Sequence, residues 1–333
     1  MPLMSFEEAM ALAGDASKTV LLGNGFSMAY DTETFRYFVF LQRLRENPDF
    51  ANLVTVFDVI GTDDFEKVMN ALHTSLTICN NYNCTCEELN QIRTDEIDLK
   101  LKLIEFISDT HPRASTDISD AKYRSTRMFL SKFSEYYTTN YDLLLYWALL
   151  RSQVGGVQLR YNDGFSGIAP GELTWAKKIE QTIFYIHGAM HLYKNHHDVV
   201  KLRYNSTDPL RTKVRERIIR DDFPLFVAGR NSAEKIEKIE SNRYLRDCME
   251  RFSVIDGALF IHGHSIDDND AHIWDVIAVN PNIRAVFISL IGDEGTHENI
   301  AKIARAARLA TDDRPVKYYS AESANLWTEL PET

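Results

Sequence analysis

The sequence predicts an α/β fold, a Rossmann-like doubly wound parallel sheet with helices packed around it. Short runs rich in aromatic or β-branched residues recur along the chain, and they are apolar on both faces, as buried parallel strands are. Helical patterns lie between most of these runs, which is typical of a doubly wound sheet. The predicted strands are 19–22, 136–139, 183–186, 225–227, 258–261, 285–289 and 316–319, and the predicted helices are 141–151, 209–219, 242–252, 271–279 and 297–309.

The length of 333 residues favours one large domain with an insertion, or two domains. We interpret residues 1–333 as one domain with two insertions. Residues 31–132 contain no convincing strand, and Ile97, Leu101 and Ile104 repeat at helical spacing, so this stretch is predicted to be a helical insertion. Residues 155–175 contain several glycine turn signals and are predicted to form a loop or a small hairpin.

Composition excludes several classes of protein. The net charge of −11 opposes contacts with phosphate backbones, so we expect no direct nucleic-acid binding. No apolar run approaches the ~20 residues that span a bilayer, and the N-terminus carries acidic residues where a signal peptide carries cations. The four cysteines form neither a disulfide framework nor paired zinc knuckles. We therefore expect a cytoplasmic protein without a membrane partner.

A glycine turn follows the first predicted strand, in the order Gly23, Asn24, Gly25, Phe26 and Ser27. Two glycines let the backbone turn tightly and approach a pyrophosphate, toward which the next helix directs its N-terminus. The third glycine of the GxGxxG pattern is absent, so a purely structural turn is an equally good interpretation.

Polar residues follow three other predicted strands. Asn140, in the segment 138–142, is placed to position a water or a ribose hydroxyl, or to cap a helix with Asp142 in its first turn. His187 precedes a glycine and is placed to act as a base near neutral pH, or to be structural. The segment 263–265 suits a ribose or adenine. Because the carboxyl ends of parallel strands meet at one edge, we expect all four motifs to lie together.

Together these motifs resemble the sirtuin, or silent information regulator, superfamily over roughly residues 18–290. The segment 23–27 is similar to its GAGxS loop, 138–142 to its TQNxD motif, 187–188 to its catalytic His-Gly, and 263–265 to its late Gly-x-Ser motif. The similarity is greater to bacterial sirtuin-like proteins of antiviral defence, which carry GNGFS-like loops and TTNYD motifs. The zinc ribbon of the deacylases is missing, since no cysteine lies between Cys86 and Cys248.

The resemblance implies NAD as substrate, no zinc, and cleavage of the nicotinamide–ribose bond by water. It implies that Asn140 orients the water and the ribose hydroxyls and that His187 accepts a proton. It also implies that Ser27 and the 23–25 backbone hold the pyrophosphate. Asp142 would order the Asn140 loop. It further implies a regulated anti-phage effector that depletes NAD as a homo-oligomer or with a partner such as a HerA-type ATPase. The candidate catalytic residues are Asn140 and His187, and the candidate binding residues are Gly23, Asn24, Gly25, Phe26, Ser27, Asp142, Gly263, His264 and Ser265.

Two alternatives remain open. One is a sensor or scaffold that binds NAD or ADP-ribose without turnover. The other is a metal-dependent hydrolase built on the cluster His262, His264, Asp267, Asp268, Asp270 and His272, although its spacing matches no metal motif and its acidic run is typical of a helix N-terminus. We expect no site at His191, His196 and His197, interpreted as an exposed loop, or at residues 234–240, interpreted as a solvated amphipathic helix.

Overall fold

The computed structural model describes most of the chain. The described residues are 3–32, 44–62, 65–84, 87–109, 112, 114–151, 154, 158–159, 161–167, 172–195, 198–203, 210–220, 222–227 and 232–329.

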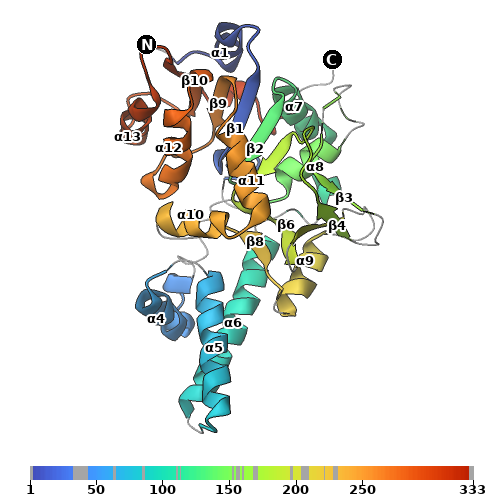
Figure 1. Ribbon diagram of the computed structural model, residues 1–333, viewed down its shortest axis with the longest axis vertical. Helices are drawn as coiled ribbons and strands as arrows, with labels where there is room; N and C mark the ends of the chain where they lie inside the picture. The colour runs from blue at the N-terminus through green and yellow to red at the C-terminus, as the bar shows by residue number, and fades with distance from the viewer. Residues whose placement is uncertain are drawn as a thin grey trace.

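A six-stranded parallel sheet forms the centre of the fold, which confirms the predicted class (Figure 1). Its strands, in spatial order, are β5 (Ile183–Tyr185), β2 (Glu135–Thr138), β1 (Lys18–Leu22), β9 (Gly257–His262), β10 (Ile283–Leu290) and β11 (Val316–Ser320). In chain order this arrangement reads 3-2-1-4-5-6, the order of the Rossmann fold. The direction of winding reverses between β1 and β9, so the ligand crevice of such a sheet is expected at their carboxyl ends.

Helices with well-formed N-terminal caps accompany this sheet. The side chains of Ser5, Ser119, Asn242 and Thr296 each accept a hydrogen bond from a first-turn N–H group, which satisfies a donor that the helix itself leaves unpaired. These four helices are α1 (Phe6–Ala13), α7 (Asp120–Leu130), α11 (Arg243–Phe252) and α13 (His297–Ala306). Two others, α8 (Leu144–Leu150) and α12 (Ala271–Val279), begin without a hydrogen bond from the side chain of the capping residue.

A second, five-stranded antiparallel sheet lies between β2 and β9 in the sequence. Its strands, in spatial order, are β3 (Phe165–Ser166), β4 (Glu172–Trp175), β7 (Asp198–Leu202), β6 (Gly188–Asn195) and β8 (Pro224–Phe226), and helix α9 (Leu210–Ile219) follows β7. The prediction that 225–227 is a parallel strand is wrong, because β8 pairs antiparallel with β6. The prediction of an exposed loop at His191 is also wrong, since this side chain is fully buried in β6. His196 and His197 lie outside the described residues.

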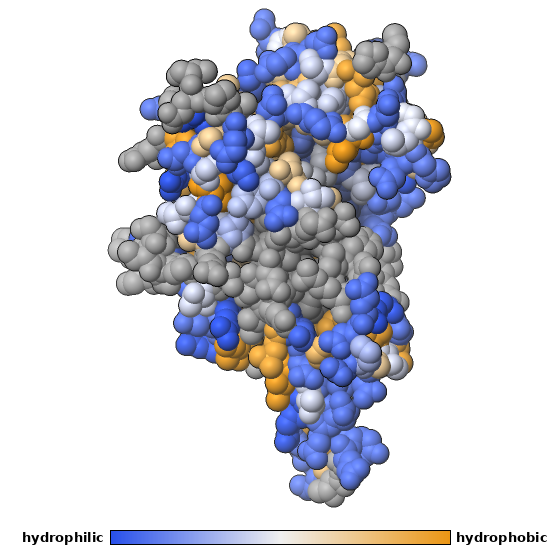
Figure 2. All heavy atoms as spheres, turned by 180° about the vertical axis from the view of Figure 1, so that it is seen from behind, coloured by the Kyte–Doolittle hydropathy of each residue, from blue (hydrophilic) through white to orange (hydrophobic). Residues whose placement is uncertain are grey.

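The helical insertion forms an arm that projects away from the parallel sheet (Figure 1). It comprises α4 (Ala51–Ile60), α5 (Phe65–Asn81) and α6 (Glu87–Asp109), with residues 33–43 outside the described part. Leu53, Phe57 and Leu99 belong to a small core of its own. Figure 2 shows mostly hydrophilic side chains along the outer part of this arm. Ile97 and Leu101, on which the helical spacing was based, are about half exposed.

No helix in the described ranges is both long and apolar enough to cross a bilayer.

Candidate functional site

The four predicted motifs end level with one another at one edge of the parallel sheet. Leu22 of β1 pairs with Thr138 of β2 and with His262 of β9, and Thr138 also pairs with Tyr185 of β5. The residues two positions further along these four strands are therefore equivalent in register, on strands spaced roughly 4.8 Å apart. They are His264, Asn24, Asn140 and His187.

The glycines of the first and last motifs let two loops close on each other between β1 and β9. Gly25 donates its N–H to the Gly263 carbonyl oxygen at 2.7 Å, and Gly23 donates to the His262 carbonyl oxygen at 2.9 Å. A Cβ on Gly25 would lie 2.6 Å from the Gly263 Cα. The expectation that these N–H groups hold a pyrophosphate therefore needs correction, because in this conformation they bind protein carbonyls.

Asn24, between these glycines, has a different character. Its side-chain Oδ1 is buried, and no described residue donates a hydrogen bond to it. Leaving a buried acceptor without a donor is energetically unfavourable, so this oxygen is a natural partner for a hydroxyl or amide of a ligand at this edge of the sheet.

Ser27 and Asp142 hold Asn140 in place. The Asn140 Nδ2 donates to the Gly23 carbonyl at 3.0 Å and to Ser27 Oγ at 3.1 Å, while Ser27 Oγ donates to Asp142 Oδ2 at 2.5 Å. Asp142 Oδ1 accepts the N–H of Leu144, at the start of α8. Since both amide hydrogens of Asn140 are used, its Oδ1 is the end available to a ligand. Ser27 is fully buried and positions Asn140, which corrects its predicted contact with a phosphate.

Replacing Ser27 with alanine is expected to destabilise the fold by about 1 to 3 kcal/mol, because Asp142 loses a donor and Asn140 loses an acceptor in a buried environment. Urea denaturation followed by circular dichroism measures this change. Ser75→Ala, at an exposed position of α5, should stay within about 0.5 kcal/mol of wild type. Equal losses of stability in Ser27→Ala and Ser75→Ala would argue against a positioning role for Ser27.

Two of the predicted binding residues point elsewhere. The Phe26 ring is buried against Trp327, whose Nε1 donates to the Phe26 carbonyl at 2.9 Å, so Phe26 belongs to the core. The Ser265 side chain is exposed, and its carbonyl accepts from Arg305 at 3.0 Å. Neither side chain joins the row of Asn140 and His187.

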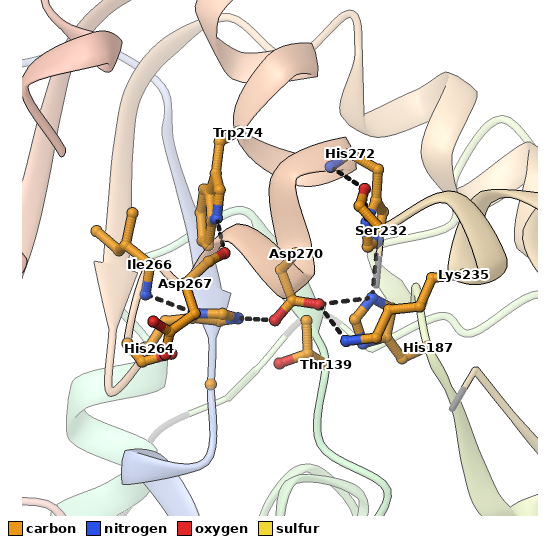
Figure 3. A network of polar contacts seen from close by, with 12 residues as sticks. Thr139, His187, Ser232, Lys235, His264, Ile266, Asp267, Asp270, His272 and Trp274 are labelled. Carbon is orange, nitrogen blue, oxygen red and sulfur yellow. Dashed lines mark hydrogen bonds and ion pairs between the residues drawn. The ribbon is translucent and has the colours of Figure 1, made fainter. Parts of the chain in front are cut away.

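His187 lies where the chain passes from the parallel sheet into the antiparallel one. The next residue, Gly188, has a φ of +80°, and the His187 side chain contacts His272 of α12. The His187 Nε2 lies 3.0 Å from the His272 Nε2, and His272 contacts Ser232 Oγ through both its Nδ1, at 3.1 Å, and its backbone N–H, at 2.8 Å (Figure 3). The His187 side chain is 4% exposed.

Asp270 links this pair to His264, which follows β9 (Figure 3). Its Oδ1 accepts from Lys235 Nζ at 2.7 Å and lies 3.8 Å from His187 Nε2, while its Oδ2 lies 3.5 Å from His264 Nε2. Because His264 Nδ1 accepts the Ile266 N–H, its Nε2 carries the hydrogen and faces the carboxylate. Ile266 has a φ of +59°, which is strained for a β-branched residue and typical of functional loops.

Burial governs the charges of this network. It lowers the pKa of His187 well below the ordinary value, and it lowers the pKa of His264 and of His272 to about 4. Burial alone would raise the pKa of Asp270, but His187, His264 and Lys235 keep it below its ordinary value. At neutral pH the three imidazoles are therefore neutral and the Asp270 carboxyl is ionised.

Comparison with known proteins adds one result. A family described as a domain of unknown function, DUF4917, matches residues 20–327. The chain belongs to this family. The matched span contains Asn24, Asn140, His187, Asp270 and His272, so the whole network lies within the DUF4917 domain. A comparison with curated proteins found no match.

The structure divides the histidine and aspartate cluster that the metal-hydrolase alternative requires. In the DUF4917 domain, His262 Nδ1 contacts the Tyr319 hydroxyl at 3.0 Å in the core. Asp267 and Asp268 pair with Arg305 and Arg308 at the surface. Only the remaining members of the cluster, His264, Asp270 and His272, belong to the network around His187.

Two residues of this network were missed from the sequence. Helix α10 (Ser232–Glu240) supplies Ser232 and Lys235, so the interpretation of 234–240 as a solvated helix is wrong at Lys235, which donates to Asp270. The alternation of lysine and glutamate hides Lys235, because nothing local distinguishes the lysine that faces inward. Asp270 lies at the N-terminus of α12 as the sequence predicts, but its side chain binds Lys235 and does not cap the helix.

Proposed function

We propose that the chain hydrolyses NAD at the nicotinamide–ribose bond, giving nicotinamide and ADP-ribose. The observation that carries this proposal is the equivalent placement of Asn140 and His187 at the carboxyl ends of neighbouring strands, beside the reversal point of a Rossmann-ordered sheet. Sheets of this order bind dinucleotides at that edge. The buried Asn24 Oδ1 and the resemblance of the four motifs to sirtuins support the same ligand.

The reaction does not require a covalent bond between the protein and the substrate. The C–N bond to the cationic nicotinamide breaks, water adds to the ribose carbon through an oxocarbenium-like transition state, and one proton of the water must be accepted. Asn140 Oδ1 would accept a hydrogen bond from the water or a ribose hydroxyl. The neutral His187 would take the proton, a role typically worth ~10² to 10⁴ in rate.

In the cell we propose a cytoplasmic effector of bacterial anti-phage defence that acts by depleting NAD under control of a trigger. Depletion is toxic, so activity would depend on assembly into a homo-oligomer or on a partner such as a HerA-type ATPase. The projecting arm of α4, α5 and α6 is the surface that we assign to this assembly (Figure 1). Its exposed Ile97 and Leu101 suit a protein interface better than water.

A catalytic metal is less well supported, because Lys235 already supplies a positive charge to Asp270. A sensor that binds NAD or ADP-ribose without turnover would use the same crevice, and the experiment below separates it from an enzyme.

Purified protein incubated with NAD is expected to release nicotinamide and ADP-ribose, followed by chromatography. Asn140→Ala should abolish most of this activity, whereas Asn90→Ala, at an exposed position of α6, should keep it. No turnover, combined with a higher melting temperature in ADP-ribose, would favour the sensor or an enzyme that awaits its activator. Neither turnover nor a shift in melting temperature would overturn the proposal.

A further inference from the structure

Three potential metal-ligand atoms converge beside the row of Asn140 and His187. One ligand atom from each of His187, His272 and Asp270 lies within 4.8 Å of the other two. The Nε2 atoms of the two histidines are 3.0 Å apart. Around a tetrahedral zinc ion with bonds of about 2.0 to 2.1 Å, neighbouring ligand atoms lie roughly 3.3 Å apart, so a small separation of the two rings would admit an ion.

The surroundings of these three groups also resemble those of metal ligands. Metal-binding histidines usually engage their second ring nitrogen, and ligating carboxylates are themselves hydrogen-bonded. Here the His272 Nδ1 contacts Ser232 Oγ, and the second oxygen of Asp270 faces the His264 Nε2. Two imidazoles and one carboxylate form a donor set that zinc and similar divalent ions accept, with a fourth position left for water.

The ammonium group of Lys235 disfavours binding of a metal ion at this position. It donates to Asp270 Oδ1 at 2.7 Å, close to the position that a divalent ion would occupy. Two positive charges at such a distance repel strongly in a largely buried site. An ion must therefore displace the ammonium, and removing the ammonium should strengthen binding of the ion.

We propose that His187, Asp270 and His272 bind one divalent transition-metal ion such as Zn²⁺, in competition with the ammonium group of Lys235. The ion occupies the Nε2 lone pair of His187, which makes it an inhibitor and not a catalyst. The binding site stands on the geometry alone, and only the inhibition rests on the proposed NAD hydrolysis.

Equilibrium dialysis of the untagged full chain against ZnCl₂ tests the site. Wild type is expected to bind one ion, and Lys235→Met should bind it at least about tenfold more tightly because a repulsive charge is gone. His272→Ala should weaken binding by more than about tenfold. The control, His297→Ala, removes an exposed histidine at the start of α13 and should bind as wild type does.

A urea transition close to that of wild type would show that Lys235→Met is folded, because an unfolded chain also binds zinc through its histidines and cysteines. Tighter binding by folded Lys235→Met keeps the test decisive if His272→Ala folds poorly. Failure of both wild type and Lys235→Met to bind zinc would overturn the proposal, as would unchanged affinity in His272→Ala. Zinc should also slow NAD hydrolysis by wild type and slow it at lower concentration in Lys235→Met. If wild type binds zinc but does not turn over NAD, the metal site stands and the proposed function fails.

Discussion

Replacing Gly188 with alanine is expected to remove more than about 4 kcal/mol of stability, a large share of the roughly 5 to 15 kcal/mol of a typical domain. The reason is steric, since a Cβ at this position would lie 1.8 Å from the Leu225 carbonyl oxygen, and the φ of +80° disfavours any side chain. Strand β8 cannot move away, because Gly188 pairs with Phe226 and the backbone carbonyl of His187 accepts the N–H of Val227. Urea denaturation and the yield of folded protein measure the loss.

Gly292→Ala is the matched control for this prediction. Its φ of +67° also disfavours a side chain, but a Cβ there would meet nothing within 4 Å. Gly292→Ala should therefore lower the free energy of unfolding only by the backbone strain, about 1 to 3 kcal/mol. If the two variants lose the same stability, the close approach of β8 is not what requires glycine beside His187.

Replacing His187 with glutamine is expected to slow NAD hydrolysis by roughly 10² to 10⁴ while NAD still binds. Glutamine preserves much of the volume of the buried ring but cannot accept a proton at neutral pH, so the loss should fall on kcat more than on KM. Initial rates over a range of NAD concentrations separate these two quantities.

His297→Gln, the same change at an exposed histidine, should leave the rate unaltered. A urea transition close to that of wild type would show that His187→Gln is folded. A folded His187→Gln enzyme with the wild-type kcat would remove His187 from the mechanism and leave Asn140 as the remaining candidate.

Much of the parallel sheet could be predicted because its signals are local. Strands such as β1 and β9 are mostly apolar and are followed directly by a glycine, and this pattern depends only on burial of both faces and on the turn that follows. Most of the antiparallel sheet was not predicted from the sequence. Strand β6 is buried over its first six residues, so its sequence shows neither the alternation of a half-buried strand nor the spacing of a helix.

The candidate site was predictable to a similar extent. Asn140 and His187 follow predicted strands, so their placement at one edge followed from the fold class. The partners of these residues did not follow. Ser232 and Lys235 come from a helix with an ordinary surface pattern, and Ser27 resembles a phosphate ligand until its hydrogen bonds to Asn140 and Asp142 are known.

The sequence by itself determined the fold class, the absence of a cysteine-based zinc ribbon and the residues that reach the carboxyl edge of the sheet, because apolar periodicity and strand ends are properties of short segments. Only the tertiary structure decided that β1 and β9 flank the reversal point, that Gly23 and Gly25 close against Gly263, and that Asp270 joins His187 to Lys235. These contacts join segments far apart in the chain, and the packing of both sheets and α10 sets the ångström-scale distances on which hydrogen bonds and ion pairs depend.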